Sequence, residues 1–194
     1  MSLKINCQLR RDNFNLEVHL AVESGAVLAI TGENGSGKTS TLDMIAGLLA
    51  CTTGKISLSD RVFDDSTTNQ FVQPELRGVS TVFQGGCLFS HMSVEKNVIF
   101  GRGAALRNTP RFDSAVEQFN LASLLRRKPS TLSGGQRQRV VIAGAMVLKP
   151  QLLVADEPVS SLDASVRGEI LALLQRLARD ENMAVLVVTH DLGL

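Results

Sequence analysis

The segment Gly32-Glu33-Asn34-Gly35-Ser36-Gly37-Lys38-Thr39 decides the fold of this 194-residue chain. It matches the pattern G-x-x-x-x-G-K-[ST], in which glycines let backbone N–H groups turn toward a phosphate. The helix that follows such a segment adds the positive end of its dipole. Here an apolar run at residues 26–30 precedes the segment and a helical pattern at residues 38–50 follows it. This order predicts a phosphate-binding loop rather than an accidental glycine-rich turn.

Three more short runs share the apolar composition of residues 26–30, namely residues 79–83, 152–155 and 184–188. Such runs are typical of strands in a parallel sheet that is covered on both faces. Helical patterns lie between them at residues 133–148 and 163–178. Strands that alternate with helices predict a doubly wound α/β core.

Two other regions carry different patterns. Residues 3–9 and 16–22 alternate polar with apolar side chains, which predicts an N-terminal antiparallel β subdomain. Residues 86–131 lack strand character and carry helical patterns near residues 93–98 and 113–125, which predicts a helical lobe. Because 194 residues suffice for one well-filled core and are few for two, we expect residues 1–194 to form a single domain.

Composition excludes several classes of protein. The chain is 44% hydrophobic and carries 20 basic against 19 acidic residues, so it is globular and lacks the charge excess that gathers nucleic acid. The three cysteines, Cys7, Cys51 and Cys87, form no C-x-x-C pair, which favours reduced thiols over a disulfide framework or zinc. No apolar run approaches the roughly 18 residues of a membrane span, so we expect membrane association through another protein.

Polar residues follow each apolar run, at the sheet edge where α/β proteins bind ligands. They are Gln84, Asp156 with Glu157, and Thr189 with His190. We expect Asp156 to bind Mg²⁺, and Glu157 to orient and deprotonate a water that attacks a γ-phosphate. The alternative is that Asp156 and Glu157 are exposed turn residues before Pro158.

The loop residues have matching roles. Lys38 is expected to neutralise the β- and γ-phosphates, and Thr39 to supply a hydroxyl to Mg²⁺. Ser40, in the same first helical turn, is expected near the α-phosphate. These assignments predict ATP with Mg²⁺ as the ligand.

The segment Leu132-Ser133-Gly134-Gly135-Gln136 begins another predicted helix. Ser133 and Gln136 match the S-x-x-Q capping box. Capping does not explain Gly134 and Gly135, each of which costs about 1 kcal/mol relative to alanine in a helix interior. The two glycines suggest close approach by a ligand, and therefore a second phosphate-binding helix terminus.

The ordered motifs GENGSGKT, VFQ, LSGGQ, LLVADE, SSLD and TH resemble those of the ATP-binding-cassette (ABC) ATPases over nearly the whole chain. The resemblance implies a P-loop NTPase core and two subunits that associate head to tail. In that arrangement Ser133, Gly134, Gly135 and Gln136 act on ATP held by the P-loop of the other subunit.

The same resemblance assigns further roles. It implies that Gln84 senses the metal and the attacking water, and that residues 85–89 couple to a membrane partner. It places His190 at the γ-phosphate with Glu157, and Phe14 against the adenine. Asp163 would cross the dimer interface, although helix N-capping explains it nearly as well.

The resemblance implies an ATP-hydrolysing subunit on the cytoplasmic side of the cell membrane. Its partners would be a membrane-spanning permease, a second ATPase subunit and, indirectly, a solute-binding protein, with no nucleic acid. The motifs most resemble importers of molybdate-like and other small solutes. The alternative is a soluble ABC ATPase of DNA repair or ribosome function. Only four residues follow His190, so we expect a chain shortened at its C-terminus, and Ser90, Gly144 and Ser161 depart from the usual family residues.

Overall fold

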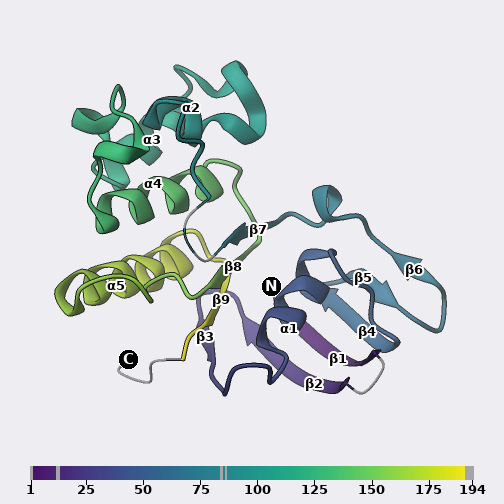
Figure 1. Cartoon of the computed structure of the whole chain (residues 1–194). Coiled ribbons are helices and arrows are strands. Elements are labelled where there is room, and N and C mark those ends of the chain that lie inside the picture. Colours follow the sequence, from purple (N-terminus) through teal and green to yellow (C-terminus); the bar gives the residue numbers. More distant parts are fainter. Residues whose placement is uncertain (1, 12–13, 84, 86, 191–194) are drawn as a thin grey trace.

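The computed structural model describes residues 2–11, 14–83, 85 and 87–190. Its central element is a parallel sheet in the order β3-β9-β8-β7, which confirms the four predicted apolar strands (Figure 1). These strands span Val27–Ile30 (β3), Ala184–Val188 (β9), Leu152–Asp156 (β8) and Val79–Val82 (β7).

Burial on both faces explains why the central strands are apolar throughout. On β8, Leu153 and Ala155 face a core shared with the helices, whereas Leu152 and Val154 face a second core beneath the antiparallel sheet. The strand β9 alternates in the same way. Since neither face meets water, a polar side chain would lose hydration on either side.

The second sheet is antiparallel, in the order β2-β1-β4-β5-β6. The predicted pair is present as β1 (Ser2–Arg11) and β2 (Phe14–Glu23), with Leu9 opposite Leu16. Three further strands extend this sheet beyond the predicted pair: β4 (Thr53–Leu58), β5 (Arg61–Asp65) and β6 (Gln70–Phe71). Figure 1 shows this sheet and α1 on one side of the parallel sheet, and α4 and α5 on the other.

Five α-helices lie in the described part of the chain: α1 (Lys38–Ala46), α2 (Val94–Val98), α3 (Pro110–Gln118), α4 (Gly134–Met146) and α5 (Ala164–Asp180). Short 3-10 helices span Pro74–Leu76, Phe100–Leu106, Ala122–Leu124 and Pro129–Thr131.

Two helices are shorter than their sequence patterns. The first, α1, ends four residues earlier than the predicted residue 50, because Gly47 adopts φ 83° and its N–H caps the helix. The other, α3, ends at Gln118, and Asn120 at φ 54° separates it from the following 3-10 turn.

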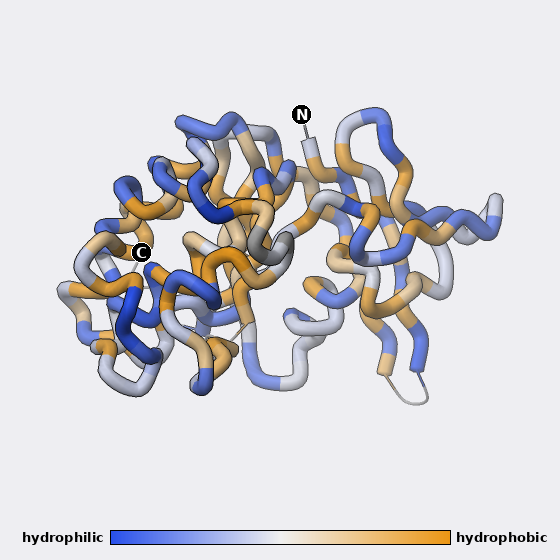
Figure 2. Tube along the Cα trace, turned by 90° about the horizontal axis from the view of Figure 1, so that it is seen from above, coloured by the Kyte–Doolittle hydropathy of each residue, from blue (hydrophilic) through white to orange (hydrophobic). Residues whose placement is uncertain are grey.

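Hydropathy follows the layers of the fold. Figure 2 shows many hydrophobic segments in the interior of the molecule and many hydrophilic segments at its periphery. Within the described residues, no helix combines the length and hydrophobicity that a bilayer crossing requires.

Candidate active site

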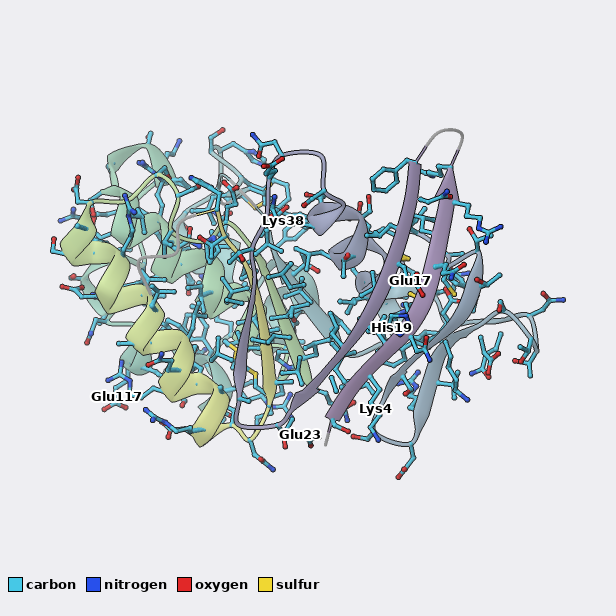
Figure 3. The ribbon with its side chains drawn as sticks, turned by 90° about the horizontal axis from the view of Figure 1, so that it is seen from below. Lys4, Glu17, His19, Glu23, Lys38 and Glu117 are labelled. Atoms are coloured by element: carbon cyan, nitrogen blue, oxygen red, sulfur yellow. The ribbon has the colours of Figure 1, made fainter. Side chains whose placement is uncertain are left out.

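The loop between β3 and α1 folds around its own lysine. Lys38 Nζ donates to the carbonyls of Gly32 (2.7 Å) and Glu33 (2.8 Å), and the Ser36 N–H donates to the Glu33 carbonyl (3.2 Å). The ammonium group is thereby held against the backbone of the loop. Figure 3 shows Lys38 between the two sheets, toward the end where β2 begins, with Glu23 at the far end of β2.

Gly37 stands at the N-cap of α1 with φ 97°, a left-handed conformation that side chains rarely adopt. A Cβ atom there would lie 2.8 Å from Leu16 Cδ1 and 3.0 Å from Phe14 Cζ. The start of β2 therefore packs directly on the loop and leaves no room for a side chain at Gly37. This contact places Phe14 beside the loop and in the lining of the cleft described next.

A cleft of about 400 Å³ opens over this loop and gathers residues from four segments of the chain. Its lining holds part of the predicted site, namely Phe14, Asn34, Gly35, Gly37, Lys38, Thr39, Ser40, Asp156 and Glu157, together with Val188. Gly32, Glu33 and Ser36 are exposed in the same loop, although they are not part of this lining.

Asp156 ends β8 at the floor of the cleft. Burial, and then the charge of Glu157, raise the pKa of Asp156, while a hydrogen bond from Thr39 opposes the rise. Asp43 on α1 raises the pKa of Asp156 further. Ionised Asp156 is therefore costly at this position, and a cation would relieve that cost.

Glu157 and His190 form a direct pair beside Asp156. His190 Nδ1 lies 2.9 Å from Glu157 Oε1, with the Glu157 side chain 15% exposed and the His190 side chain 55% exposed. The Glu157 N–H donates to the Val188 carbonyl (2.9 Å), and its φ of 47° is left-handed. Unusual backbone geometry of this kind is concentrated at functional sites. It turns the Glu157 carboxylate into the cleft instead of continuing the strand.

The LSGGQ segment has its predicted capping box. The Gln136 N–H donates to Ser133 Oγ (3.2 Å), and the Ser133 N–H donates to Gln136 Oε1 (3.0 Å). The lining of the 400 Å³ cleft does not include residues 133–136. Within one chain this second helix terminus is thus separate from the phosphate-binding loop.

Two other predicted residues have different outcomes. Asp163 occupies the N-cap position of α5, yet its side chain makes no capping hydrogen bond and the residue is exposed. Capping therefore does not account for its side chain. Gln84 lies outside the described residues, as do residues 191–194.

Sequence patterns missed several residues that shape the site. Leu16 packs on Gly37, and Leu162 and Val166 lie where Cβ atoms on Gly134 and Gly135 would be. These are ordinary apolar residues in a strand and a helix, so no local signal distinguishes them. Sequence patterns also did not indicate Asp43, which lies five residues after Lys38 on the helix that begins at the loop and affects the pKa of Asp156.

Comparison with known proteins agrees with this geometry. The ABC transporter family profile matches residues 16–160. Molybdenum import ATP-binding protein ModC of Brucella melitensis is 40% identical over 191 residues, covering 98% of the chain and 53% of that relative. ModC of Aliivibrio fischeri is 38% identical over 190 residues, covering 98% of the chain and 52% of that relative. The chain thus spans about half the length of the curated relatives it matches.

Two solved structures share the fold. CbiO1 of Clostridium perfringens, part of the ABC transporter complex cbiONQ, has a TM-score of 0.79 at 30% identity, with 97% of this chain and 78% of that chain covered. The ATP-binding cassette MJ0796, in a dimeric post-hydrolysis state bound to ADP and Pi, has a TM-score of 0.76 at 28% identity, with 100% and 89% covered.

Proposed function

Because the chain belongs to the ABC transporter family, we propose that it binds and hydrolyses ATP as the energy-coupling subunit of an importer. The observation that carries the proposal is the single cleft in which a lysine-bearing glycine loop meets Asp156 and Glu157, with His190 on Glu157. The soluble alternative in DNA repair or ribosome function gains no support, since the relatives named above are import proteins.

The proposed reaction is attack of water on the γ-phosphorus of ATP. Glu157 accepts the proton of this water, the new P–O bond forms, and the bond from the γ-phosphorus to the β–γ bridging oxygen breaks, which leaves ADP and phosphate. Lys38 and the loop N–H groups hold the negative charge of the triphosphate. His190 holds Glu157 through their 2.9 Å contact, and its proposed second role is to contact the γ-phosphate.

Magnesium fits the oxygen groups of this cleft. Thr39 and Asp156 offer a hydroxyl and a carboxylate that already interact, and burial with the charge of Glu157 raises the pKa of Asp156 despite the opposing charge of Lys38. Mg²⁺ is commonly held by one or two protein oxygens plus substrate phosphates, which agrees with the finding of no larger cluster of ligating residues in the described chain. When bound with ATP, the ion would neutralise charge on the phosphates. Gln84 would be a further ligand.

A second copy of the chain would complete the site. The capped helix terminus at residues 133–136 is not part of the cleft lining in its own subunit, and head-to-tail association would place it over the ATP of a partner. Asp163 is exposed and free of a capping bond, in keeping with a role at that interface. The dimeric MJ0796 structure supports such pairing.

A separate apolar groove of about 420 Å³ supports the proposed permease contact. It lies between the end of α1, β7, α2 and α4, and its exposed aromatic residues include Phe83, Phe89 and Phe100. Asn97 orders the loop at residues 87–89 by accepting the Phe89 N–H (2.8 Å) and donating to the Phe89 carbonyl (3.2 Å). A cytoplasmic segment of a membrane permease is the proposed occupant, which would hold the chain on the cytoplasmic side of the membrane.

The cargo of this importer is proposed from the named relatives. Both ModC relatives are named for molybdenum import, so we infer a small oxyanion such as molybdate, delivered to the permease by a solute-binding protein. The ATPase subunit itself would not contact that anion.

Phosphate release by purified protein tests the proposal. With ATP and Mg²⁺, the wild type should release phosphate at a rate per subunit that rises with protein concentration, because two subunits build each site. Glu157→Gln should retain ATP and lose at least 99% of turnover. Equal rates for the two proteins would reject Glu157 as the base, and a rate per subunit independent of concentration would reject the paired site.

A further inference from the structure

The glycine pair at the start of α4 is in close contact with the chain's own α5 region. A Cβ atom on Gly135 would lie 2.6 Å from Val166 Cγ1, and one on Gly134 would lie 2.9 Å from Leu162 Cδ2. Both distances are shorter than side-chain carbons tolerate. Val166 is β-branched and stiff at χ1, so it cannot swing aside as readily as the end of Leu162. The missing side chain at Gly135 is therefore already explained inside one subunit.

The residues that fill this space belong to the segment that follows Glu157. The Ser160 N–H and hydroxyl both donate to the Glu157 carbonyl (3.3 and 3.2 Å), and the Leu162 N–H donates to the Val159 carbonyl (3.1 Å). Arg167 Nε donates to the Leu162 carbonyl (3.0 Å). Val159 and Leu162 are buried. A short series of turns thus connects the backbone of Glu157 to the surface on which the two glycines pack.

A second contact joins the same two helices one turn further along. Arg139, four residues after Gly135, bonds Glu169 across a distance of 2.6 Å between Nη2 and Oε2. Glu169 lies three residues after Val166, so the apolar contact and the ion pair fall on adjoining turns of α4 and α5. The start of α4 is consequently attached to α5 at two successive points.

We propose that Val166, assisted by Leu162, is a positioning residue for the phosphate-binding start of α4, and that Gly135 is required chiefly to admit Val166. This inference rests on the proposed head-to-tail dimer, in which the start of α4 and Glu157 of one subunit serve opposite ATP sites. Packing within the subunit holds the start of α4 against the turns that follow Glu157.

A double-mutant cycle separates this role from direct contact of Gly135 with nucleotide. The variants are Gly135→Ala, Val166→Ala and their combination, each in a Glu157→Gln background that retains ATP. Gly144→Ala is the matched control in the same helix, because its Cβ would lie 3.6 Å from the nearest atom, the Asn97 carbonyl oxygen. Sedimentation with ATP and Mg²⁺ measures dimer dissociation, and a nucleotide titration of the dilute monomer measures ATP binding to its own loop.

Gly135→Ala should weaken the ATP-dependent dimer at least tenfold and leave the monomer's ATP affinity within twofold. Adding Val166→Ala should restore dimer dissociation to within threefold of Val166→Ala alone, and Gly144→Ala should dimerise like its parent. A double variant whose dimer dissociates as readily as that of Gly135→Ala would overturn the inference, because the space at Gly135 would then be needed by the ligand and not by Val166.

Failure of the proposed function has a different signature. If the parent protein forms no dimer with ATP, the head-to-tail function is wrong, and thermal unfolding decides the packing claim. Alanine is the better helix former, so Gly135→Ala lowers the melting temperature only if it collides with Val166. A melting temperature that falls in Gly135→Ala and recovers in the double variant supports the positioning contact, and one that does not fall overturns it.

Discussion

Arg77 anchors the far end of the helix that begins at the phosphate loop, and its replacement by methionine should destabilise the whole fold. The side chain is 0% exposed. Its Nη1 donates to the carbonyls of Met44 (2.7 Å) and Ile45 (3.0 Å) at the end of α1, and its Nε donates to the Val72 carbonyl (2.7 Å). The guanidinium carbon also lies 5.3 Å from the centroid of the Phe63 ring. One cation therefore joins α1 to the β5–β6 region.

The magnitude follows from opposing terms. Three short hydrogen bonds from a charged donor are each worth about 1.5–3 kcal/mol. Burial lowers the pKa of Arg77, with the charge of Asp64 opposing that effect, so the buried cation also carries a desolvation cost that methionine removes. Removing one partner of a buried ion pair costs about 3–5 kcal/mol, because the remaining polar groups stay buried without a partner. Arg77→Met leaves the backbone carbonyls and Asp64 in that state, so we expect it to lower the free energy of unfolding by about 3–5 kcal/mol.

Urea denaturation monitored by circular dichroism measures this loss directly. In a thermal melt of a chain of this size, a loss of about 3–5 kcal/mol should lower the melting temperature by about 10–15 °C. Arg77→Lys keeps the charge but not the planar fork, so it should lose less stability than Arg77→Met. A change below about 1 kcal/mol in Arg77→Met would refute the reasoning, since the three bonds would then contribute nothing net.

Three other outcomes follow from the site. Gly37→Ala should cost about 1–3 kcal/mol of stability and weaken ATP binding at least tenfold, because φ 97° and contact with Leu16 both disfavour a Cβ; a fluorescence titration with unchanged affinity would contradict this. Because the pKa of Asp156 is raised in the fold, the folded state binds its proton more tightly, so stability falls as pH rises above the ordinary Asp range. Without Mg²⁺, urea denaturation should show that Asp156→Asn gains stability relative to the wild type as the pH rises from about 4 to about 7. A difference in unfolding free energy between the two proteins that does not change with pH would argue against a raised pKa. Burial raises the pKa of Cys7 to about 11 and that of Cys51 to about 12, so a disulfide reagent should modify exposed Cys87 quickly and the other two thiols only after denaturation; Cys87→Ser, which should show no fast thiol, is the check.

The central strands and long helices were predictable because their local sequence carries the same information as their burial. Residues 152–155 and 184–188 are apolar throughout because two cores cover them, one on each face. The α5 pattern likewise repeats at helical spacing, with Ile170, Leu173, Leu174 and Leu177 buried. In both cases burial selects apolar residues among neighbours in the sequence, as a continuous run in the strands and at helical spacing in α5.

The strands β4 to β6 were not predictable, because distant residues satisfy their polar groups. The strand β5 contains buried Asp64 and Asp65, which in isolation suggest a turn. Asp64 accepts the Cys51 N–H (2.9 Å), and Asp65 lies 3.3 Å from Lys55 Nζ on the neighbouring strand. Such partners exist only after the sheet has formed.

The site shows the same division. The glycine loop, Asp156 and Glu157 follow buried strands, so the sheet topology places them together and the sequence predicts their meeting. The reason for Gly134 and Gly135 was incomplete, because close approach by a ligand was expected and the structure adds contacts from Leu162 and Val166. Contacts between residues about 30 positions apart in the sequence leave no local pattern.

Retention of ATP by the folded protein tests the central claim most directly. Equilibrium dialysis with Mg²⁺ should show one nucleotide bound per subunit in the wild type, and binding weakened at least a hundredfold in Lys38→Ala, whose circular dichroism should match the wild type. A folded wild-type protein that retains no nucleotide, or a Lys38→Ala variant that binds equally well, would contradict the assignment of this cleft to a triphosphate.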